Sequence, residues 1–274
     1  MKNITFSTVG KKLRLERILG KDNKAVVFAF DHAFEHGPSD IPINRIDPKD
    51  VVKIAVKNGF DALMTTRGTA RATYKIWENK IPLILKITSK TTLRPKEQQL
   101  LQSPIGTVED AVALGADAVA VTVYWGSPYE DIMIKNFLTI SEKCDRYGIP
   151  ILMLAYPRGP NISDRHDPEI VRYAARAGAE LGADLIKTHY TGSTETFKEV
   201  VHATPIPVLM SGGPRKDNPT DFLKVVRSVM DAGAAGLVVG RNIFQSPNPE
   251  EISKAIISIF HENKSVKEAS KFLS

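Results

Sequence analysis

Short apolar runs alternate along the sequence with longer amphipathic stretches, and this alternation limits the folds that the chain can adopt. Each run is rich in Val, Ile, Leu and Met and nearly continuously apolar, which is typical of parallel strands covered on both faces. The eight runs are Ala25–Phe30, Asp61–Thr66, Pro82–Ile87, Asp117–Tyr124, Pro150–Tyr156, Asp184–His189, Pro207–Ser211 and Gly236–Arg241.

The stretches between the runs have helical patterns. Asp167–Glu169 combines an N-cap residue, a proline at the first helical position and an acid in the first turn. The apolar positions that follow at helical spacing are Ile170, Tyr173, Ala174 and Ala177. The sequence therefore predicts a helix that starts at Pro168.

A weak internal repeat joins the end of each helix to the next strand. Residues 58–62, 114–118 and 181–185 share a glycine followed two residues later by an aspartate, and residues 232–236 echo the design. A glycine can end a helix in the left-handed conformation, and a small residue after it lets the next strand start at once. The repeat therefore predicts tightly connected strand–helix units.

Eight such units without a break in composition predict a single (β/α)8 TIM barrel of the α/β class, and 274 residues suffice for one. A doubly wound open sheet is the alternative, but no glycine fingerprint follows the first run. We expect residues 1–24 to form an N-terminal extension, of which residues 1–20 cover the closed end of the barrel, and residues 25–274 to form the catalytic barrel.

The composition narrows the possible partners and the compartment. Lys and Arg number 37 against 31 Asp and Glu, a net charge of +6 that suits an anionic small molecule, and no basic-aromatic stripe favours nucleic acid. No apolar run reaches the ~18 residues of a membrane helix, and no signal-peptide core is present. The single cysteine, Cys144, excludes an intramolecular disulfide and is expected to be buried in a helix. We expect a cytoplasmic protein without a membrane or nucleic-acid partner.

Polar residues gather where the predicted strands end, and in TIM barrels these carboxyl ends form the active site. The strand ends that carry them are Asp31-His32, Tyr156–Arg158, Lys187–His189, Ser211–Gly213 and Gly240–Asn242. All five are expected to converge on one mouth of the barrel.

Lys187 carries the sharpest chemical signal, because it stands inside an apolar run. A charged ammonium is costly there unless it is paired, and a desolvated neutral amine can attack a carbonyl to form a Schiff base. A structural lysine paired with a carboxylate across the barrel is the alternative. Near it, Tyr156 and Asp31 are candidates for proton transfer, against packing and turn capping respectively.

The loops after the last two strands have the chemistry of a phosphate site. Glycines in Ser211–Gly213 and at Gly240 let backbone N–H groups approach phosphate oxygens, and Arg241 adds a bidentate cation. A metal site from His32, Glu35, His36, Asp40 and His189 is conceivable, but no tight metal-binding spacing occurs. We therefore expect a phosphorylated ligand and no metal.

From about Gly10 to His261 the sequence resembles the archaeal-type class I fructose-bisphosphate aldolases and their relative 2-amino-3,7-dideoxy-D-threo-hept-6-ulosonate synthase. The motifs that carry the resemblance are residues 30–38 (FDHAFEHGP), 156–159 (YPRG), 187–192 (KTHYTG), 210–214 (MSGGP) and 239–242 (VGRN). As an ordered set they are specific for this superfamily, and less so for one member.

The resemblance implies a role for each candidate. Lys187 would form the Schiff base, Tyr156 would donate a proton on the departing aldehyde side, and Asp31 would assist proton transfer. The ketose 1-phosphate would bind to Ser211, Gly212, Gly240 and Arg241, and the substrate would be lined by His32, His36, Asp40 and Arg158. Thr188, His189 and Gly213 of the same motifs are also expected to contact substrate. The resemblance further implies a ring-shaped homo-oligomer and no cofactor.

Two sets of residues point to different members of the superfamily. Residues 35–38 (EHGP) and 86–93 (KITSKTTL) look like the fructose-bisphosphate aldolases, and the synthases usually lack a histidine at the position of His36. Residues 12–18 and 161–169 look more like the synthases, and Leu154 stands where the aldolases have a tryptophan. The substrate-side residues favour fructose-bisphosphate aldolase.

Overall fold

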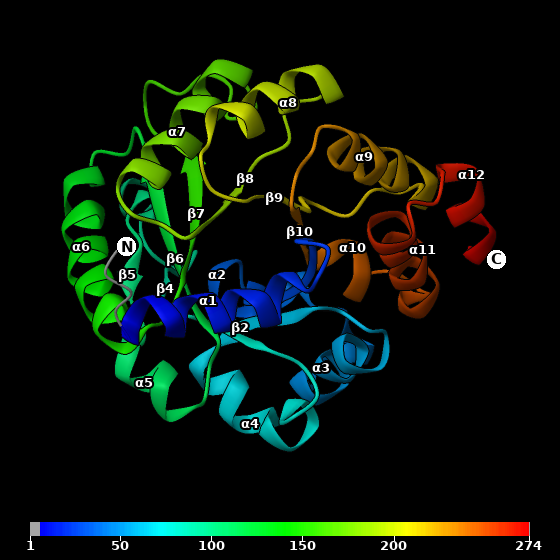
Figure 1. Cartoon of the computed structure of the whole chain (residues 1–274), viewed down its shortest axis with the longest axis horizontal. Helices are drawn as coiled ribbons and strands as arrows, with labels where there is room; N and C mark the ends of the chain where they lie inside the picture. The colour runs from blue at the N-terminus through cyan, green and yellow to red at the C-terminus, as the bar shows by residue number, and fades with distance from the viewer. Residues whose placement is uncertain (1–5, 274) are drawn as a thin grey trace.

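Each predicted apolar run forms a strand, and these strands close into a parallel barrel, seen from one end in the computed structural model of Figure 1, which describes residues 6–273. The strands are β1 (Ala25–Phe30), β2 (Ala62–Thr66), β3 (Leu83–Lys86), β6 (Ala118–Trp125), β7 (Ile151–Pro157), β8 (Leu185–Thr188), β9 (Val208–Ser211) and β10 (Gly236–Val239). Their order is β1-β10-β9-β8-β7-β6-β3-β2, with β1 paired to both β10 and β2. The (β/α)8 prediction is confirmed, and the open-sheet alternative is wrong because no edge is left unpaired.

Helices after the strands cover the outside of the barrel (Figure 1). They are α3 (Pro48–Lys57), α4 (Arg67–Trp77), α5 (Val108–Ala113), α6 (Glu130–Tyr147), α7 (Pro168–Glu180), α8 (Thr194–Ala203), α9 (Pro219–Asp231) and α11 (Pro249–Glu262). Short elements lie in the loops: α2 (His32–Glu35), η1 (Pro38–Asp40), η2 (Ile43–Arg45), the hairpin β4 (Thr88–Ser89) and β5 (Ser103–Pro104) with η3 (Lys96–Leu100), α10 (Arg241–Phe244), α12 (Val266–Ala269) and η4 (Ser270–Phe272).

The helix ends follow the local chemistry of the sequence. The Asp167 carboxylate accepts hydrogen bonds from the backbone N–H groups of Glu169 and Ile170, and α7 starts at Pro168, as predicted. The repeat glycines Gly115 and Gly182 have φ of 67° and 104°, the left-handed conformation that the repeat predicts. These glycines turn the chain directly into the next strand.

The aspartates of the repeat lie just before the strands rather than in them. Their carboxylates accept hydrogen bonds from backbone N–H groups of neighbouring strands. Asp61 accepts a 2.6 Å hydrogen bond from the backbone of Val26, and Asp184 accepts one of 2.8 Å from Ile151. Each carboxylate thus satisfies a backbone N–H at the start of a neighbouring strand. The repeat therefore ties adjacent strands together at the amino-terminal end of the barrel.

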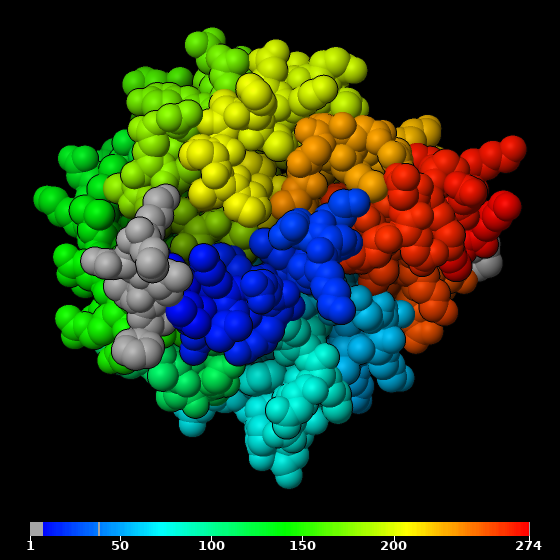
Figure 2. Space-filling view, viewed as in Figure 1, coloured from blue at the N-terminus to red at the C-terminus, as the bar shows by residue number. Residues whose placement is uncertain are grey.

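Helix α1 (Phe6–Leu19) lies across this amino-terminal end, and its atoms occupy the middle of that face in Figure 2. Arg17 forms a 2.6 Å ion pair with Asp117, Lys11 lies 3.0 Å from Asp184, and Arg14 donates to the carbonyl of Gly148. The partners of α1 thus come from the starts of β6, β7 and β8. Of the predicted extension, residues 1–5 lie outside the described residues.

The core fills the barrel and the layer between strands and helices. Every residue of β1 and β7 is buried, as expected for strands covered on both faces. Cys144 is fully buried in α6, and burial raises the pKa of its thiol to about 12, which makes it unreactive. No helix within residues 6–273 is long and apolar enough to cross a bilayer.

His261, at the end of α11, links the carboxyl-terminal region to the amino-terminal end of the barrel. Its ring nitrogens lie 2.9 Å from Asp61 and 2.9 Å from Asp22. The hydrogen bond that the His261 ring donates to Asp61, helped by the one it donates to Asp22, raises the pKa of His261 to about 9 against the opposing effect of burial. The imidazolium is therefore the form that stabilises this contact.

We predict a stability difference that depends on pH. The pKa of His261 is higher in the folded state than its unfolded value of about 6.5, so its contribution is complete below pH ~6.5 and disappears as the pH rises through about 9. His261→Gln should lower the free energy of unfolding by about 1 kcal/mol at pH 6, after allowance for solvent screening, and by much less at pH 10. Urea unfolding at both pH values measures this.

His202→Gln is the matched control, because His202 is exposed in the last turn of α8. An equal destabilisation by His261→Gln at pH 6 and pH 10 would contradict a charged contact.

Candidate active site

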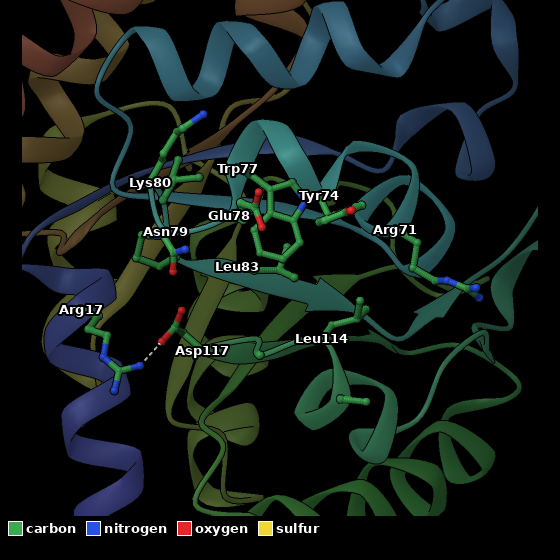
Figure 3. A pocket seen from close by; sticks show the side chains of 14 residues that line it. Arg17, Arg71, Tyr74, Trp77, Glu78, Asn79, Lys80, Leu83, Leu114 and Asp117 are labelled. Carbon is green, nitrogen blue, oxygen red and sulfur yellow. Dashed lines mark hydrogen bonds and ion pairs between the residues drawn. The ribbon is translucent and has the colours of Figure 1, made fainter.

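Two of the larger hollows lie at opposite ends of the barrel. The hollow at the amino-terminal end, shown in Figure 3, has a volume of about 940 Å³ and is lined by side chains of α1, α4 and the segments around β3 and β6. Its Arg17 is paired with Asp117, and the indole of Trp77 donates to the carbonyl of Ala70. None of the predicted site residues lies there.

The hollow at the carboxyl-terminal end has a volume of about 660 Å³ and gathers the predicted site. Its lining includes Asp31, His32, His36, Tyr156, Arg158, Lys187, His189, Ser211, Gly212, Gly213, Gly240 and Arg241. These residues come from the ends of β1, β7, β8, β9 and β10, which the parallel barrel brings to one mouth.

Two predicted residues do not line this cavity. Thr188 is fully buried and its hydroxyl donates a 2.9 Å hydrogen bond to the carbonyl of Ala155, because neighbouring side chains of a strand point to opposite faces and Lys187 takes the inner one. Thr188 is thus predicted to contact substrate but does not line the cavity. Asp40 lies behind the lining, 3.7 Å from the guanidinium of Arg241.

Lys187 reaches the cavity from β8 with only 6% of its surface exposed. Within residues 6–273, its amine has no hydrogen bond or ion pair. A buried amine without a counter-ion can exist as the neutral nucleophile at lower cost than one held by carboxylates. Of the two interpretations of Lys187, this geometry favours the nucleophile over the structural lysine.

Lys86, at the end of β3, is the lysine that does have a structural ion pair. It is fully buried, and its ammonium lies 3.1 Å from Asp31 and 3.3 Å from Glu35. Burial alone would lower the pKa of Lys86, but the two carboxylates outweigh it and raise the pKa. Sequence reasoning did not select Lys86 for the site, although it shares the signal of Lys187, a lysine in an apolar run.

The carboxylate of Asp31 is kept as an anion beside the cavity. Burial alone would raise its pKa, but the positive charge of Lys86 prevails and holds the pKa of Asp31 well below its usual range. Burial lowers the pKa of His32 to about 4 and that of His189 to about 2, so both imidazoles are neutral near pH 7. The anion of Asp31 therefore lies beside two neutral histidines, His32 and His189, in the lining of the cavity.

Tyr156 is held in place by contacts on both its ring and its hydroxyl. The ring stacks on His189 with centroids 4.5 Å apart and an interplanar angle of 14°. The hydroxyl lies 3.1 Å from the hydroxyl of Ser211, and the guanidinium of Arg158 lies 5.8 Å from the ring centre. The phenol is thus positioned between β7, β8 and β9, where it can exchange a proton with a bound molecule.

The glycine-rich loops after β9 and β10 leave room for an anion. A Cβ on Gly240 would lie 2.4 Å from the carbonyl oxygen of Ala29, so only glycine fits. The Nε of Arg241 is buried without a hydrogen-bond partner among residues 6–273, so this donor is free to bind an anion. The N–H of Gly212 donates to the carbonyl of Val238, so its contribution to an anion site is space rather than a donor.

Asn242, in α10 directly after β10, joins these two loops. Its side-chain amide donates to the carbonyls of Gly212 and Pro214 and accepts from the backbone of Lys216. Two further lining residues, Arg165 and His166, come from the loop before α7. No local sequence pattern marks these two residues as part of a site, because only the tertiary fold brings their loop to the mouth of the barrel.

Two of the possible metal ligands, Glu35 and His32, have other contacts. Glu35 bonds to Lys86 and to the hydroxyl of Tyr124, and His32 packs edge-on against Phe244 at 5.2 Å. Among residues 6–273 no group of three or more His, Cys, Asp or Glu side chains is arranged to hold a metal ion.

Fold and site together describe a barrel enzyme of the aldolase class. The chain belongs to the DeoC/LacD family of aldolases, whose family model matches residues 25–246. It is 39% identical to the class 1 fructose-bisphosphate aldolase of Thermoproteus tenax, over 92% of this chain and 95% of that protein. It is 33% identical to a 2-amino-4,5-dihydroxy-6-oxo-7-(phosphonooxy)heptanoate synthase of Streptomyces griseus, over 92% and 91%.

Solved structures agree with this assignment. The structure of a Schiff-base-forming fructose-1,6-bisphosphate aldolase superposes with a TM-score of 0.86 and 37% identity, covering 92% of this chain and all of that one (100%). A fructose-bisphosphate aldolase from Slackia heliotrinireducens has a TM-score of 0.90 at 23% identity, which supports the fold alone.

We predict that Arg241 dominates binding of inorganic phosphate. Arg241→Met removes a charged donor, so the dissociation constant should rise by roughly 10- to 100-fold, as expected for a lost charge-assisted hydrogen bond. Calorimetric titration with phosphate measures this. Arg172→Met is the control, because Arg172 lies on the outside of α7 and pairs with Glu199. Equal weakening in both variants would contradict a phosphate site at Arg241.

Proposed function

We propose that this protein is a class I aldolase that cleaves fructose 1,6-bisphosphate to glycerone phosphate and glyceraldehyde 3-phosphate, and catalyses the reverse condensation, in glycolysis and gluconeogenesis. The observation that carries the proposal is the amine of Lys187, which is buried, unpaired and directed into a cavity next to the phosphate-like site at Arg241. The 39% identity to the Thermoproteus tenax aldolase supports the choice of substrate.

The reaction starts with the neutral amine of Lys187, which attacks C2 of the open-chain ketose. The carbinolamine loses water to form an iminium, which accepts the electron pair of the C3–C4 bond as that bond breaks. A base removes the proton of the C4 hydroxyl, so glyceraldehyde 3-phosphate leaves and an enamine stays on Lys187. Protonation of the enamine at C3 and hydrolysis release glycerone phosphate and restore the amine.

The neighbours of Lys187 supply the proton transfers and the orientation. Tyr156, stacked on His189, and Asp31, held as an anion by Lys86, are placed at the cavity to move protons between the carbinolamine and the C4 hydroxyl. Binding of the 1-phosphate near Ser211, Gly212, Gly240 and Arg241 fixes C2 beside the amine, which makes the attack effectively intramolecular. No step requires a cofactor.

The second candidate is a transaldolase-type synthase that transfers a ketose fragment to another aldehyde, such as 2-amino-3,7-dideoxy-D-threo-hept-6-ulosonate synthase of aromatic amino-acid biosynthesis. The loop before α7 favours it, since residues 161–169 look like those of the synthases and Arg165 and His166 from this loop line the cavity. Leu154 also lines the cavity, at a position where the aldolases have the bulkier tryptophan. The similarity to a synthase of Streptomyces griseus also supports this second candidate. Both candidates use the same Schiff-base chemistry.

The assembly and the compartment complete the proposal. We infer a cytoplasmic homo-oligomer of the ring type. Exposed apolar side chains on the loops around the mouth, such as Leu93 at 93% and Ile43 at 83% exposure, suit contact between copies. Analytical ultracentrifugation measures the assembly.

The first test is release of triose phosphate from fructose 1,6-bisphosphate with EDTA present, followed by oxidation of NADH in a coupled assay. The wild-type protein should turn over, and Lys187→Met should lose activity by at least about 10⁴-fold because the covalent route is gone. Borohydride with glycerone phosphate should label wild type and leave Lys187→Met unlabelled.

Lys198→Met on the outside of α8 is the control and should keep both properties. Substantial turnover in Lys187→Met would contradict the covalent mechanism. Labelling without cleavage of the bisphosphate would favour the synthase, with aspartate semialdehyde as the acceptor to test.

We also predict that Tyr156→Phe lowers kcat by on the order of 10²- to 10⁴-fold, since it removes a proton-transfer group, while borohydride labelling of Lys187 persists. Tyr173→Phe is the control, because Tyr173 is 75% exposed on α7. Steady-state kinetics measure kcat, and a wild-type value in Tyr156→Phe would remove the phenol from the mechanism.

A further inference from the structure

A buried cluster of charges borders the cavity, and apart from Asp31 its members have no role in the reaction as derived above. Its centre is the ammonium of Lys86, which contacts two carboxylates, Asp31 at 3.1 Å and Glu35 at 3.3 Å. All three side chains are buried, with at most 9% of any residue exposed. One cation thus serves two anions in a region from which water is excluded.

The cluster continues through Glu35 to the opposite wall of the cavity. The hydroxyl of Tyr124 donates a 2.9 Å hydrogen bond to Glu35 and accepts one of 2.6 Å from the amide of Gln102. The guanidinium of Arg158 donates to the same hydroxyl at 3.4 Å and lies 4.9 Å from the centre of the Tyr124 ring. Asp31 and Arg158, both at the cavity, are therefore connected through Lys86, Glu35 and Tyr124.

Two carboxylates in such a place depend on the lysine between them. Buried carboxylates that are close to each other do not both ionise unless a cation compensates them, and one takes up a proton instead. Burial by itself raises the pKa of Glu35, but Lys86 outweighs it and the pKa is lowered, as for Asp31. Both carboxylates are therefore anions at neutral pH because of Lys86.

We propose that Lys86 is a positioning residue, which keeps Asp31 and Glu35 ionised together and holds Asp31 in place beside Lys187, and that it is not a second nucleophile. The inference rests on the proposed function, because the Schiff-base reaction requires Asp31 as an anion at the cavity. Lys86 itself does not line the cavity, so it acts through Asp31 and, by way of Glu35 and Tyr124, through Arg158.

Other groups also face the two carboxylates and contribute to their charge state. They are His32 and His36 from α2 and the turn after it, Lys90 after β4, Tyr124 on β6, Tyr156 on β7 and Lys187 on β8. Lys86 is the group that makes ion pairs with both carboxylates.

Lys86→Met tests the proposal by removing the charge at nearly constant side-chain length. The acid limb of the kcat–pH profile should move up by at least about one unit, since a proton is now shared by Asp31 and Glu35. On this limb one unit corresponds to about a tenfold loss of kcat. Borohydride labelling of Lys187 with glycerone phosphate should persist.

Two variants separate the positioning role from damage to the fold. Lys86→Met/Glu35→Gln leaves Asp31 without the neighbouring like charge, so the acid limb should move back from that of Lys86→Met toward that of wild type. Lys11→Met is the matched control, because Lys11 also lies between two carboxylates, Asp145 at 2.7 Å and Asp184 at 3.0 Å, at the far end of the barrel. Its acid limb should not move.

An unchanged acid limb in Lys86→Met, or an equal shift in Lys11→Met, overturns the proposal, and so does loss of labelling in Lys86→Met. If Lys86→Met does not fold, Glu35→Gln tests the proposal in its place. This variant removes a negative charge next to Asp31, so the acid limb of its kcat–pH profile should stay in place or move to lower pH. A shift to higher pH contradicts the proposal. Failure of wild type to cleave fructose 1,6-bisphosphate is a separate result, since it rejects the proposed substrate before any variant is compared.

Discussion

Pairing of the first barrel strand with the last is the constraint on which the rest of the structure depends. Ala25 of β1 lies opposite Gly236 of β10, and a Cβ at Gly236 would lie 1.8 Å from the carbonyl oxygen of Ala25. The close approach of the two backbones at this seam is thus possible only with glycine. Because the seam closes, Asp31 after β1 and Arg241 after β10 face the same cavity as Lys187 on β8, two strands from β10 in the barrel order.

Two lysines on strands of this barrel have opposite surroundings, because their neighbours differ. Lys86 is enclosed by the carboxylates Asp31 and Glu35, which favour its charged form, whereas Lys187 faces the cavity with no counter-ion among the described residues. Residue type and apolar surroundings are alike in the two cases. Position relative to Asp31 and Glu35 therefore decides which amine is suited to attack a carbonyl.

The two ends of the barrel divide stability from chemistry. At the amino-terminal end several charged groups form ion pairs, as in Arg17 with Asp117 and His261 with Asp61, and these pairs fasten α1 and α11 to the strands. At the carboxyl-terminal end several polar atoms have no protein partner, among them the Nε atoms of Arg158 and Arg241. The larger hollow lies at the paired end, so size alone does not identify the active site; unsatisfied donors and an unpaired amine do.

The sequence by itself determined the strand–helix order, the left-handed glycines, the start of α7 and the residues at the strand ends, because these follow from local periodicity and backbone preferences. It also indicated Lys187, through a charge in an apolar run. Only the tertiary structure decided that Thr188 faces away from the cavity, that Arg165 and His166 reach it, and that Lys86 belongs to a charged cluster with Asp31, Glu35 and Tyr124. Such contacts join residues far apart in the chain, so they depend on strand register and barrel closure, which no local pattern encodes.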